Sequence, residues 1–270
     1  MRPEKVEELR ARFVELHREG LFVMPNAWDI GSGRILETMG FAAVATTSSG
    51  LAAALGRMDQ QVSPDELVDH VAALVAAVDI PVSVDAEHGY AQSPAGVAEF
   101  FDRIAATGAA GVSIEDFDPA VGILPVADAV ERVAVAVDVA RRHGLVLTAR
   151  AENHLYETND LDDTFDRLIR FRDVGADVVY APGLEDIGQI SRLVSAVGVP
   201  VNVLLRRHGP SVPALASAGV RRVSTGGALA FAAYGALHTA AGELLSAGTS
   251  TYLDAALPST IRDQAFDQSD

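Results

Sequence analysis

The segment PVSVDAEHGY, residues 81–90, decides how this chain folds, because an apolar run typical of a buried strand ends there in two carboxylates, Asp85 and Glu87. Residues i and i+2 of a strand point to the same side, so both acids should project together from its carboxyl end. Gly89 then favours a sharp turn that lets a ligand approach the backbone. The pair indicates a cation site, with solvated loop acids or a helix cap as the alternative.

The pattern around this segment repeats along the chain as an amphipathic helix, a turn usually marked by glycine, and a short apolar strand. The strands are rich in Val and Ala, as expected for strands buried on both faces. Eight parallel strands with intervening helices predict an α/β fold, a closed (β/α)8 barrel of the TIM type. The eight predicted strands are FVMPN (22–26), AAVAT (42–46), PVSVD (81–85), AGVSIE (110–115), VLTAR (146–150), DVVYA (177–181), VNVLL (201–205) and RRVST (221–225).

The connections between strands and helices are unequal in length. Turns that lead into strands are tight, whereas the connections over residues 48–63, 116–125 and 151–160, each of which follows a strand, are long. Barrels of this type place function on the loops after the strands, so these three should form the mouth of the site. We expect one barrel domain over residues 1–248, including an N-terminal helix, and a C-terminal appendage over 249–270.

Composition excludes several classes of partner. The 270 residues are 49% hydrophobic and carry 37 acidic against 21 basic side chains, a formal charge of -16, which argues against nucleic acid and anionic membrane surfaces. No run is long enough to cross a bilayer, and the N-terminal segment has the charge alternation of a helix rather than a signal peptide. The absence of cysteine leaves only oxygen and imidazole as metal ligands and fits a cytoplasmic protein.

Acidic side chains gather at the predicted carboxyl ends of two adjacent strands. Asp85, Glu87 and Glu115 should converge within one coordination sphere, with water at the remaining positions, as is usual for Mg²⁺. Hard oxygen ligands favour Mg²⁺ or Mn²⁺ over zinc. Arg150, across the mouth, either neutralises these acids or holds an anionic substrate in a bidentate contact.

Five segments, in order, resemble the isocitrate lyase and phosphoenolpyruvate mutase superfamily from Met24 through the eighth strand. The resemblance implies that Ser49, Gly50 and Leu51 bind a substrate carboxylate through their backbone amides. It also implies that Arg150 contacts the substrate. The five segments are PNAWDIGSGRILETMGF (25–41), TTSSGLAAALGRMD (46–59), VSVDAEHGY (82–90), VSIEDF (112–117) and LTARAE (147–152).

The resemblance further implies a Mg²⁺ site at Asp85, Glu87 and Glu115, with Asp59 nearby as an outer-sphere acid. One loop departs from the family pattern. The carbon–carbon lyases carry a Lys-(Lys/Arg)-Cys-Gly-His motif whose cysteine is the acid/base, and phosphonate-handling members carry lysine and asparagine there. The loop here, residues 116–125, reads DFDPAVGILP and contains none of these groups. Its short, apolar and acidic character fits a lid that excludes water.

We therefore expect an Mg²⁺-dependent lyase, decarboxylase or hydrolase that cleaves a carbon–carbon bond of a small 2-oxo or 2-hydroxy acid through a metal-stabilised enolate. The alternatives are a phosphorus–carbon enzyme, of the phosphonopyruvate hydrolase or phosphoenolpyruvate mutase type, and a non-catalytic carboxylate-binding barrel. The candidates for proton transfer remain open among Glu152, His154, Tyr180 and His208. The expected catalytic residues are Arg150, Glu152 and Asp59, and the expected substrate contacts are Trp28, Ser49, Gly50, Leu51, Arg150, His154, Tyr180 and Asn202.

The predicted eighth helix, residues 227–248, has no charged side chain before Glu243. A helix that is apolar nearly all round must be buried on more than one side. The resemblance implies that neighbouring barrels exchange this helix and that the dimers pair, so we expect a homotetramer built from helix-swapped dimers. The alternative is that the N-terminal helix and the tail after Thr249 cover the helix within one chain.

Overall fold

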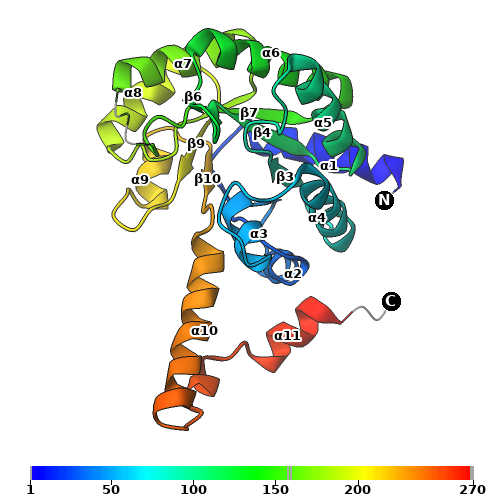
Figure 1. The fold of residues 1–270 in the computed structure, drawn as a ribbon, viewed down its shortest axis with the longest axis vertical. Coiled ribbons are helices and arrows are strands. Elements are labelled where there is room, and N and C mark those ends of the chain that lie inside the picture. The colour runs from blue at the N-terminus through cyan, green and yellow to red at the C-terminus, as the bar shows by residue number, and fades with distance from the viewer. Residues whose placement is uncertain (1, 157, 159, 268–270) are drawn as a thin grey trace.

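The computed structural model describes residues 2–156, 158 and 160–267, and eight of its strands form a single parallel sheet in the order β1-β10-β9-β8-β7-β4-β3-β2 (Figure 1). The two outer strands of this order also meet, because Asn26 bridges to Ala45 and the Ala27 amide donates to the Ala45 carbonyl at 2.7 Å. The predicted closed (β/α)8 barrel is therefore confirmed. The barrel strands are β1 (Phe22–Met24), β2 (Val44–Ala45), β3 (Val82–Asp85), β4 (Gly111–Glu115), β7 (Val146–Arg150), β8 (Val178–Tyr180), β9 (Val201–Leu204) and β10 (Arg222–Ser224).

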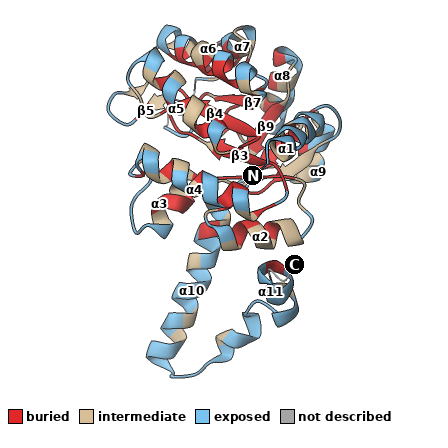
Figure 2. Cartoon of the chain, turned by 90° about the vertical axis from the view of Figure 1, so that its right-hand side faces the viewer, coloured by how far each residue is buried: buried red, intermediate tan, exposed pale blue. Residues whose placement is uncertain are grey.

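Helices follow each strand and surround the barrel, with their buried faces turned to the sheet (Figure 2). Side-chain caps define several of their starts: Ser63 and Glu66, for example, form a reciprocal capping box at the start of α4. The helices around the barrel are α2 (Ile30–Thr38), α3 (Ser48–Ala54), α4 (Pro64–Ala77), α5 (Pro94–Ala106), α6 (Val126–His143), α7 (Leu161–Asp173), α8 (Ile187–Val197) and α9 (Val212–Ser217). The last strand is followed by α10 (Ala228–Ser246).

The N-terminal helix α1 (Pro3–Leu16) closes the amino end of the barrel. Phe13 is fully buried there, in a cluster with Met24, Val146 and Val178. Its ring passes so close to β4 that a Cβ on Gly111 would lie 2.5 Å from Phe13 Cε1 and 3.0 Å from the Val146 carbonyl oxygen. A side chain at position 111 would therefore push the Phe13 ring out of its packed position.

We expect Gly111→Ala to lower the free energy of unfolding by about 1–3 kcal/mol, the usual cost of forcing extra atoms into a packed core. Gly242→Ala is the matched control, because a Cβ at Gly242 meets nothing within 4 Å and alanine favours a helix interior. Urea unfolding of the two variants measures the difference. Equal stabilities would show that α1 does not seal the barrel at this glycine.

The three long connections lie at the carboxyl end of the barrel, as expected. The first contains α3, the second forms the hairpin of β5 (Phe117–Asp118) and β6 (Gly122–Ile123), and the third follows β7. Glu157 and Asn159 of this third connection lie outside the described residues. Phe117 stacks on Tyr156 with ring centroids 3.6 Å apart and planes 6° apart, which joins the second connection to the third.

Helix α10 extends away from the barrel and is exposed along almost all its length (Figures 1 and 2). Ala230 is its one buried residue among those described. The tail, which we keep as a proposed appendage, contains the 3₁₀ turn η1 (Thr251–Ala255) and α11 (Ser259–Phe266), and α11 lies against α2 rather than on α10. None of the described helices has the length and hydropathy needed to cross a membrane. The exposed apolar side chains of α10 are Phe231, Leu237, Leu244 and Leu245.

Candidate active site

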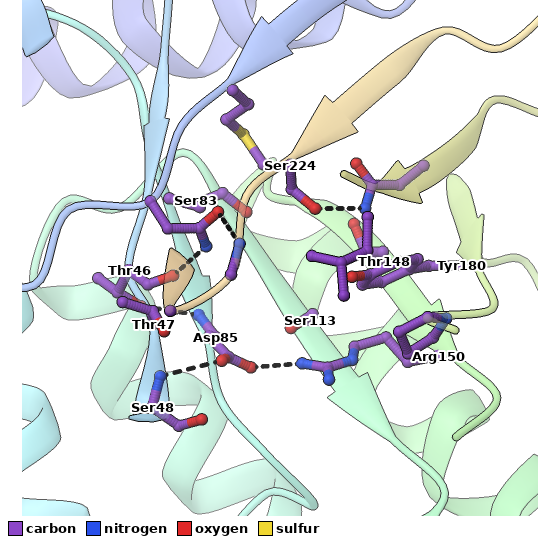
Figure 3. A pocket seen from close by; sticks show the side chains of 18 of the residues that line it. Thr46, Thr47, Ser48, Ser83, Asp85, Ser113, Thr148, Arg150, Tyr180 and Ser224 are labelled. Atoms are coloured by element: carbon purple, nitrogen blue, oxygen red, sulfur yellow. Dashed lines mark hydrogen bonds and ion pairs between the residues drawn. The ribbon is translucent and has the colours of Figure 1, made fainter. Parts of the chain in front are cut away.

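A cavity of about 180 Å³ opens at the carboxyl end of the barrel (Figure 3). It is smaller than the sites of drug-sized ligands, which measure roughly 300–1,000 Å³, so it suits a small molecule. Of the residues expected from the sequence, the following line it: Ser49, Asp59, Asp85, Arg150, Tyr180 and Asn202.

Arg150 is the centre of the charged network at this cavity. It ends β7 in register with Glu115 of β4, which brings the two side chains together across the sheet. Its Nη1 lies 2.6 Å from Asp85 Oδ1, its Nε 2.7 Å from Glu152 Oε1 and its Nη2 3.2 Å from Glu115 Oε2. Burial alone would lower the pKa of Arg150, but the three carboxylates outweigh burial and raise it well above the usual value. The guanidinium is therefore permanently charged.

Asp85 connects the end of β3 to the start of α3. Its Oδ2 accepts from the Ser48 amide at 3.1 Å, and its own amide donates to Thr46 Oγ1 at 2.9 Å. Asp59 hydrogen-bonds the Ser48 side chain. Both acids thus meet the same short turn at the mouth, as Figure 3 shows for Asp85.

Glu87 turns into the protein directly after β3. Its backbone adopts a φ of 45°, a left-handed conformation that is uncommon for a residue with a side chain. The side chain is buried, and its Oε1 has no hydrogen-bond partner among the described residues. Burial, with Asp85 close by, raises the pKa of Glu87 to about 8.

Glu115 and Glu152 are buried beside Arg150. Burial raises the pKa of Glu115 well above its usual value although Arg150 opposes the shift. Burial also raises the pKa of Glu152, to about 7, again against the effect of Arg150. The Glu152 amide donates to Asp116 Oδ1 at 2.8 Å, which fixes the backbone at this position. Neither Glu115 nor Glu152 is among the residues that line the cavity; both lie behind Arg150, which does line it. A carboxyl that titrates near neutrality beside such a group has the properties of a general acid or base.

The donor set fits a hard divalent cation in type and charge. Arg150 supplies one positive charge to three carboxylates, and Glu87 adds a fourth acid with an unpaired buried oxygen. Oxygen ligands of this kind suit Mg²⁺. In the part of the chain described, however, no three His, Cys, Asp or Glu side chains are arranged to hold a metal ion, because Arg150 lies between Asp85 and Glu115.

The remaining predicted substrate contacts lie behind the cavity wall. The Gly50 amide donates to Thr47 Oγ1 at 3.3 Å and the Leu51 amide to the Thr47 carbonyl at 3.0 Å, so both serve the first turn of α3. Trp28 packs beneath this turn: a Cβ on Gly50 would lie 2.9 Å from Trp28 Cβ. His154 packs against Gly183 and is also outside the cavity lining of the described residues.

Sequence reasoning missed the inner part of the cavity. Four of the missed polar residues each lie two positions before a polar strand-end residue, and the two-residue period of strands is the signal that would have found them. The missed lining residues include Ser83, Ser113, Thr148 and Arg222.

The raised pKa values of the buried carboxyls Glu87, Glu115 and Glu152 predict that the stability of the protein depends on pH. A carboxyl whose pKa is raised from 4.5 to about 8, as for Glu87, keeps its proton in the folded state after the unfolded chain has lost it, so stability falls as pH rises through this range. His17, whose pKa burial lowers from 6.5 to about 3, has the opposite slope, but only below 6.5. Between these limits, pH 6.5 and 8, the titration of Glu87 alone should remove about 1–2 kcal/mol of unfolding free energy from metal-free protein, and Glu115 and Glu152, whose pKa values burial also raises, add to the loss.

Urea titrations in EDTA across that range measure the slope, and Glu87→Gln should reduce it. Glu99→Gln is the control, because Glu99 lies on α5 outside the cavity lining. If wild type and Glu87→Gln lose the same stability between the two pH values, Glu87 is not the group that titrates.

Comparison with known proteins places this geometry in a family. The family model described as phosphoenolpyruvate phosphomutase matches residues 13–245. The crystal structure of a provisionally assigned lyase/mutase from Burkholderia cenocepacia J2315 is 44% identical and superposes with a TM-score of 0.94, covering 99% of this chain and 98% of that one.

Two curated relatives extend the comparison. An uncharacterised protein of Mycobacterium tuberculosis (strain ATCC 25618 / H37Rv) is 34% identical over 216 residues, which are 79% of this chain and 81% of the relative. Oxaloacetate decarboxylase of Paraburkholderia xenovorans (strain LB400) is 29% identical over 266 residues, which are 94% of this chain and 86% of the relative.

Proposed function

Because this chain belongs to the phosphoenolpyruvate mutase/isocitrate lyase superfamily, we propose that it is an Mg²⁺-dependent enzyme that cleaves a carbon–carbon bond of a small 2-oxo or 2-hydroxy acid. Members of the superfamily are lyases, decarboxylases or hydrolases of small carboxylic acids. The observation that carries the proposal is the buried Arg150 at the cavity wall, in contact with three carboxylates.

Arg150 and the start of α3 would bind the substrate carboxylate. Ser49 lines the cavity, and Gly50 and Leu51 follow it in the same turn. A guanidinium pairs with a carboxylate in a bidentate geometry, which orients the rest of the substrate. When bound, Mg²⁺ at Asp85, Glu87 and Glu115 would stabilise the negative charge that develops on the 2-oxo oxygen as a bond at C3 breaks.

Glu152 is the proton-transfer group that we propose. Its pKa of about 7 allows it to give or take a proton at neutral pH, and its bond to Arg150 Nε at 2.7 Å holds it beside the guanidinium that would bind the substrate carboxylate. Burial raises the pKa of Tyr180 to about 12, so Tyr180 acts as a hydrogen-bond donor rather than a base. His208 is exposed in the turn after β9. Asp59, at the mouth, would act as the outer-sphere acid.

The non-catalytic alternative would use the same Arg150 to bind a carboxylate without breaking a bond, and turnover separates it from the proposal. The phosphorus–carbon alternative has weaker support, because the β5–β6 hairpin carries neither the lysine nor the asparagine and places Phe117 against Tyr156 of the connection after β7.

A panel of 2-oxo acids, 2-hydroxy diacids and phosphonopyruvate, assayed with Mg²⁺ for release of pyruvate or glyoxylate, separates the three hypotheses. Cleavage of a carboxylic acid supports the proposal, and cleavage of phosphonopyruvate alone supports the phosphorus–carbon alternative. Binding without turnover supports the non-catalytic barrel.

We also propose that the chain forms a homotetramer of helix-swapped dimers. On the exposed apolar face of α10, Leu237 is 63% and Leu245 91% exposed. An apolar patch of this kind marks a surface that is buried by a protein partner. Ala230, in the first turn of α10, packs on Gly50 of α3, so the swapped helix would start from the site itself. A cytoplasmic location remains a prediction.

Sedimentation velocity at micromolar concentration tests the assembly, and we expect the mass of four chains. Leu237→Glu should dissociate the tetramer, because a charge would be buried in the interface. Leu55→Glu is the matched control, since Leu55 is exposed at the end of α3. A folded wild-type chain that sediments as a monomer would contradict the assignment.

A further inference from the structure

The interior of this barrel is polar where such barrels are usually packed with bulky branched side chains. Ser83 of β3, Ser113 of β4 and Thr148 of β7 all line the cavity below the charged mouth. The cavity therefore continues down into the barrel, and the group at its floor is Arg222 of β10.

Arg222 is 3% exposed and is held by neutral groups. Its Nε donates to Asn202 Oδ1 at 2.9 Å, its Nη2 donates to Thr148 Oγ1 at 2.8 Å, and its Nη1 lies 3.2 Å from His17 Nε2. A guanidinium has five N–H donors in a fixed fork, so these three contacts leave two donors over.

The charge of Arg222 has no counter-ion in the described chain, where no carboxylate pairs with it. His17 cannot supply one, because its Nδ1 bonds the Phe13 carbonyl at 2.8 Å and leaves Nε2 as an acceptor of the neutral ring. Burial lowers the pKa of Arg222 to about 9, so the group is still positive at neutral pH. A buried cation without a partner is unfavourable, and an anion that enters the cavity would compensate it.

A continuous wall connects this floor to the mouth. The Arg150 Cζ lies 5.4 Å from the centre of the Tyr180 ring, and Tyr180 hydrogen-bonds Ser224. Ser224 in turn accepts from Asn202 at 2.8 Å, and Asn202 holds Arg222. Two arginines therefore face one small cavity from its two ends.

From this arrangement we infer that Arg222 binds the second carboxylate of a dicarboxylic acid whose first carboxylate is held at Arg150. The inference rests on the proposed function and assigns to it the residue that would recognise the second carboxylate of a small 2-oxo or 2-hydroxy diacid. Asn202 and Thr148 orient the guanidinium fork toward the cavity, and its two remaining donors match the two oxygens of a carboxylate.

The test compares the binding of malate and 2-hydroxybutyrate, in the presence of Mg²⁺, by titration calorimetry. The two acids share a four-carbon 2-hydroxy skeleton, and a methyl group in one replaces the second carboxylate of the other. Wild type should bind malate about tenfold or more tightly. Arg222→Gln should abolish this preference and leave the affinity for 2-hydroxybutyrate unchanged. Arg221→Gln, a surface change that reaches only the Gly20 carbonyl, should keep it.

Each result decides the question. Equal binding of both acids to wild type overturns the inference but leaves the proposed function intact, and this comparison requires the wild-type protein alone. Retention of the full preference in Arg222→Gln shows that Arg222 only supports the barrel. If formate raises the affinity for 2-hydroxybutyrate in wild type but not in Arg222→Gln, the floor binds a separate small anion and the diacid assignment is wrong. Failure of both acids to bind overturns the inference, whereas the proposed function falls only if no acid of the panel is cleaved.

Discussion

Arg150→Lys should lower kcat/KM on the cleaved acid by about 100-fold or more, because a lysine keeps the charge but loses the fork. The guanidinium of Arg150 spans Asp85, Glu115 and Glu152 at once. A single ammonium cannot hold all three and a substrate carboxylate in one geometry. Steady-state kinetics on the acid identified in the panel measure the loss, and calorimetry with the same acid shows whether binding weakens too.

Arg206→Lys is the matched control for this variant. Arg206 pairs with Glu185 at 2.6 Å on the exposed side of the barrel mouth, so its replacement should leave kinetics unchanged. If Arg150→Lys also retains the parent's kcat/KM, the arginine is a structural counter-charge and does not contact substrate.

Asp85→Ala should abolish Mg²⁺ binding. Asp85 is the acid that lines the cavity at the end of β3, and it meets both Arg150 and the Ser48 amide. Removal of the Asp85 carboxylate takes away one of the three proposed Mg²⁺ ligands. It also removes one of the three ion-pair partners of Arg150. Calorimetric titration of the metal-free protein with Mg²⁺ measures the effect.

Asp85→Asn is the companion variant, because the amide oxygen can still accept from Ser48 and so preserve the turn. Asp102→Ala, a surface acid that bonds His143, is the control. Mg²⁺ affinity in Asp85→Ala as high as in the parent would show that the cation, if bound, lies elsewhere.

The barrel could be predicted from the sequence because each strand is a short Val- and Ala-rich run that ends in polar residues. The closing contact of Asn26 with Ala45 follows once eight strands are counted. The hairpin of β5 and β6 could not be predicted, since FD and GI carry no strand pattern and pair only across the turn at residues 119–121. The TSSGL segment predicts a turn at the site, and the structure has the first turn of a seven-residue helix there.

The mouth of the site was predictable because parallel strands bring their carboxyl ends to one edge, which places Asp85, Glu115 and Arg150 together. Their pairing was not, since spacing along the chain cannot show that the Arg150 side chain lies between the two acids. Arg222 stayed hidden because arginine is rarely buried and an RR pair at a strand start favours the surface. Only the register of β10 with β9 turns Arg222 inward, next to Asn202.

The proposed reaction breaks a bond at C3 of the substrate and leaves a carbanion there for protonation. The most direct measurement is NMR of the products when the acid panel is incubated in D₂O with Mg²⁺. We expect one acid to be cleaved to a product with a single deuterium on the carbon that lost its substituent, and we expect EDTA and Asp85→Asn each to abolish this reaction. Acids that bind at Arg150 but show no cleavage above the Asp85→Asn rate would contradict the proposed reaction.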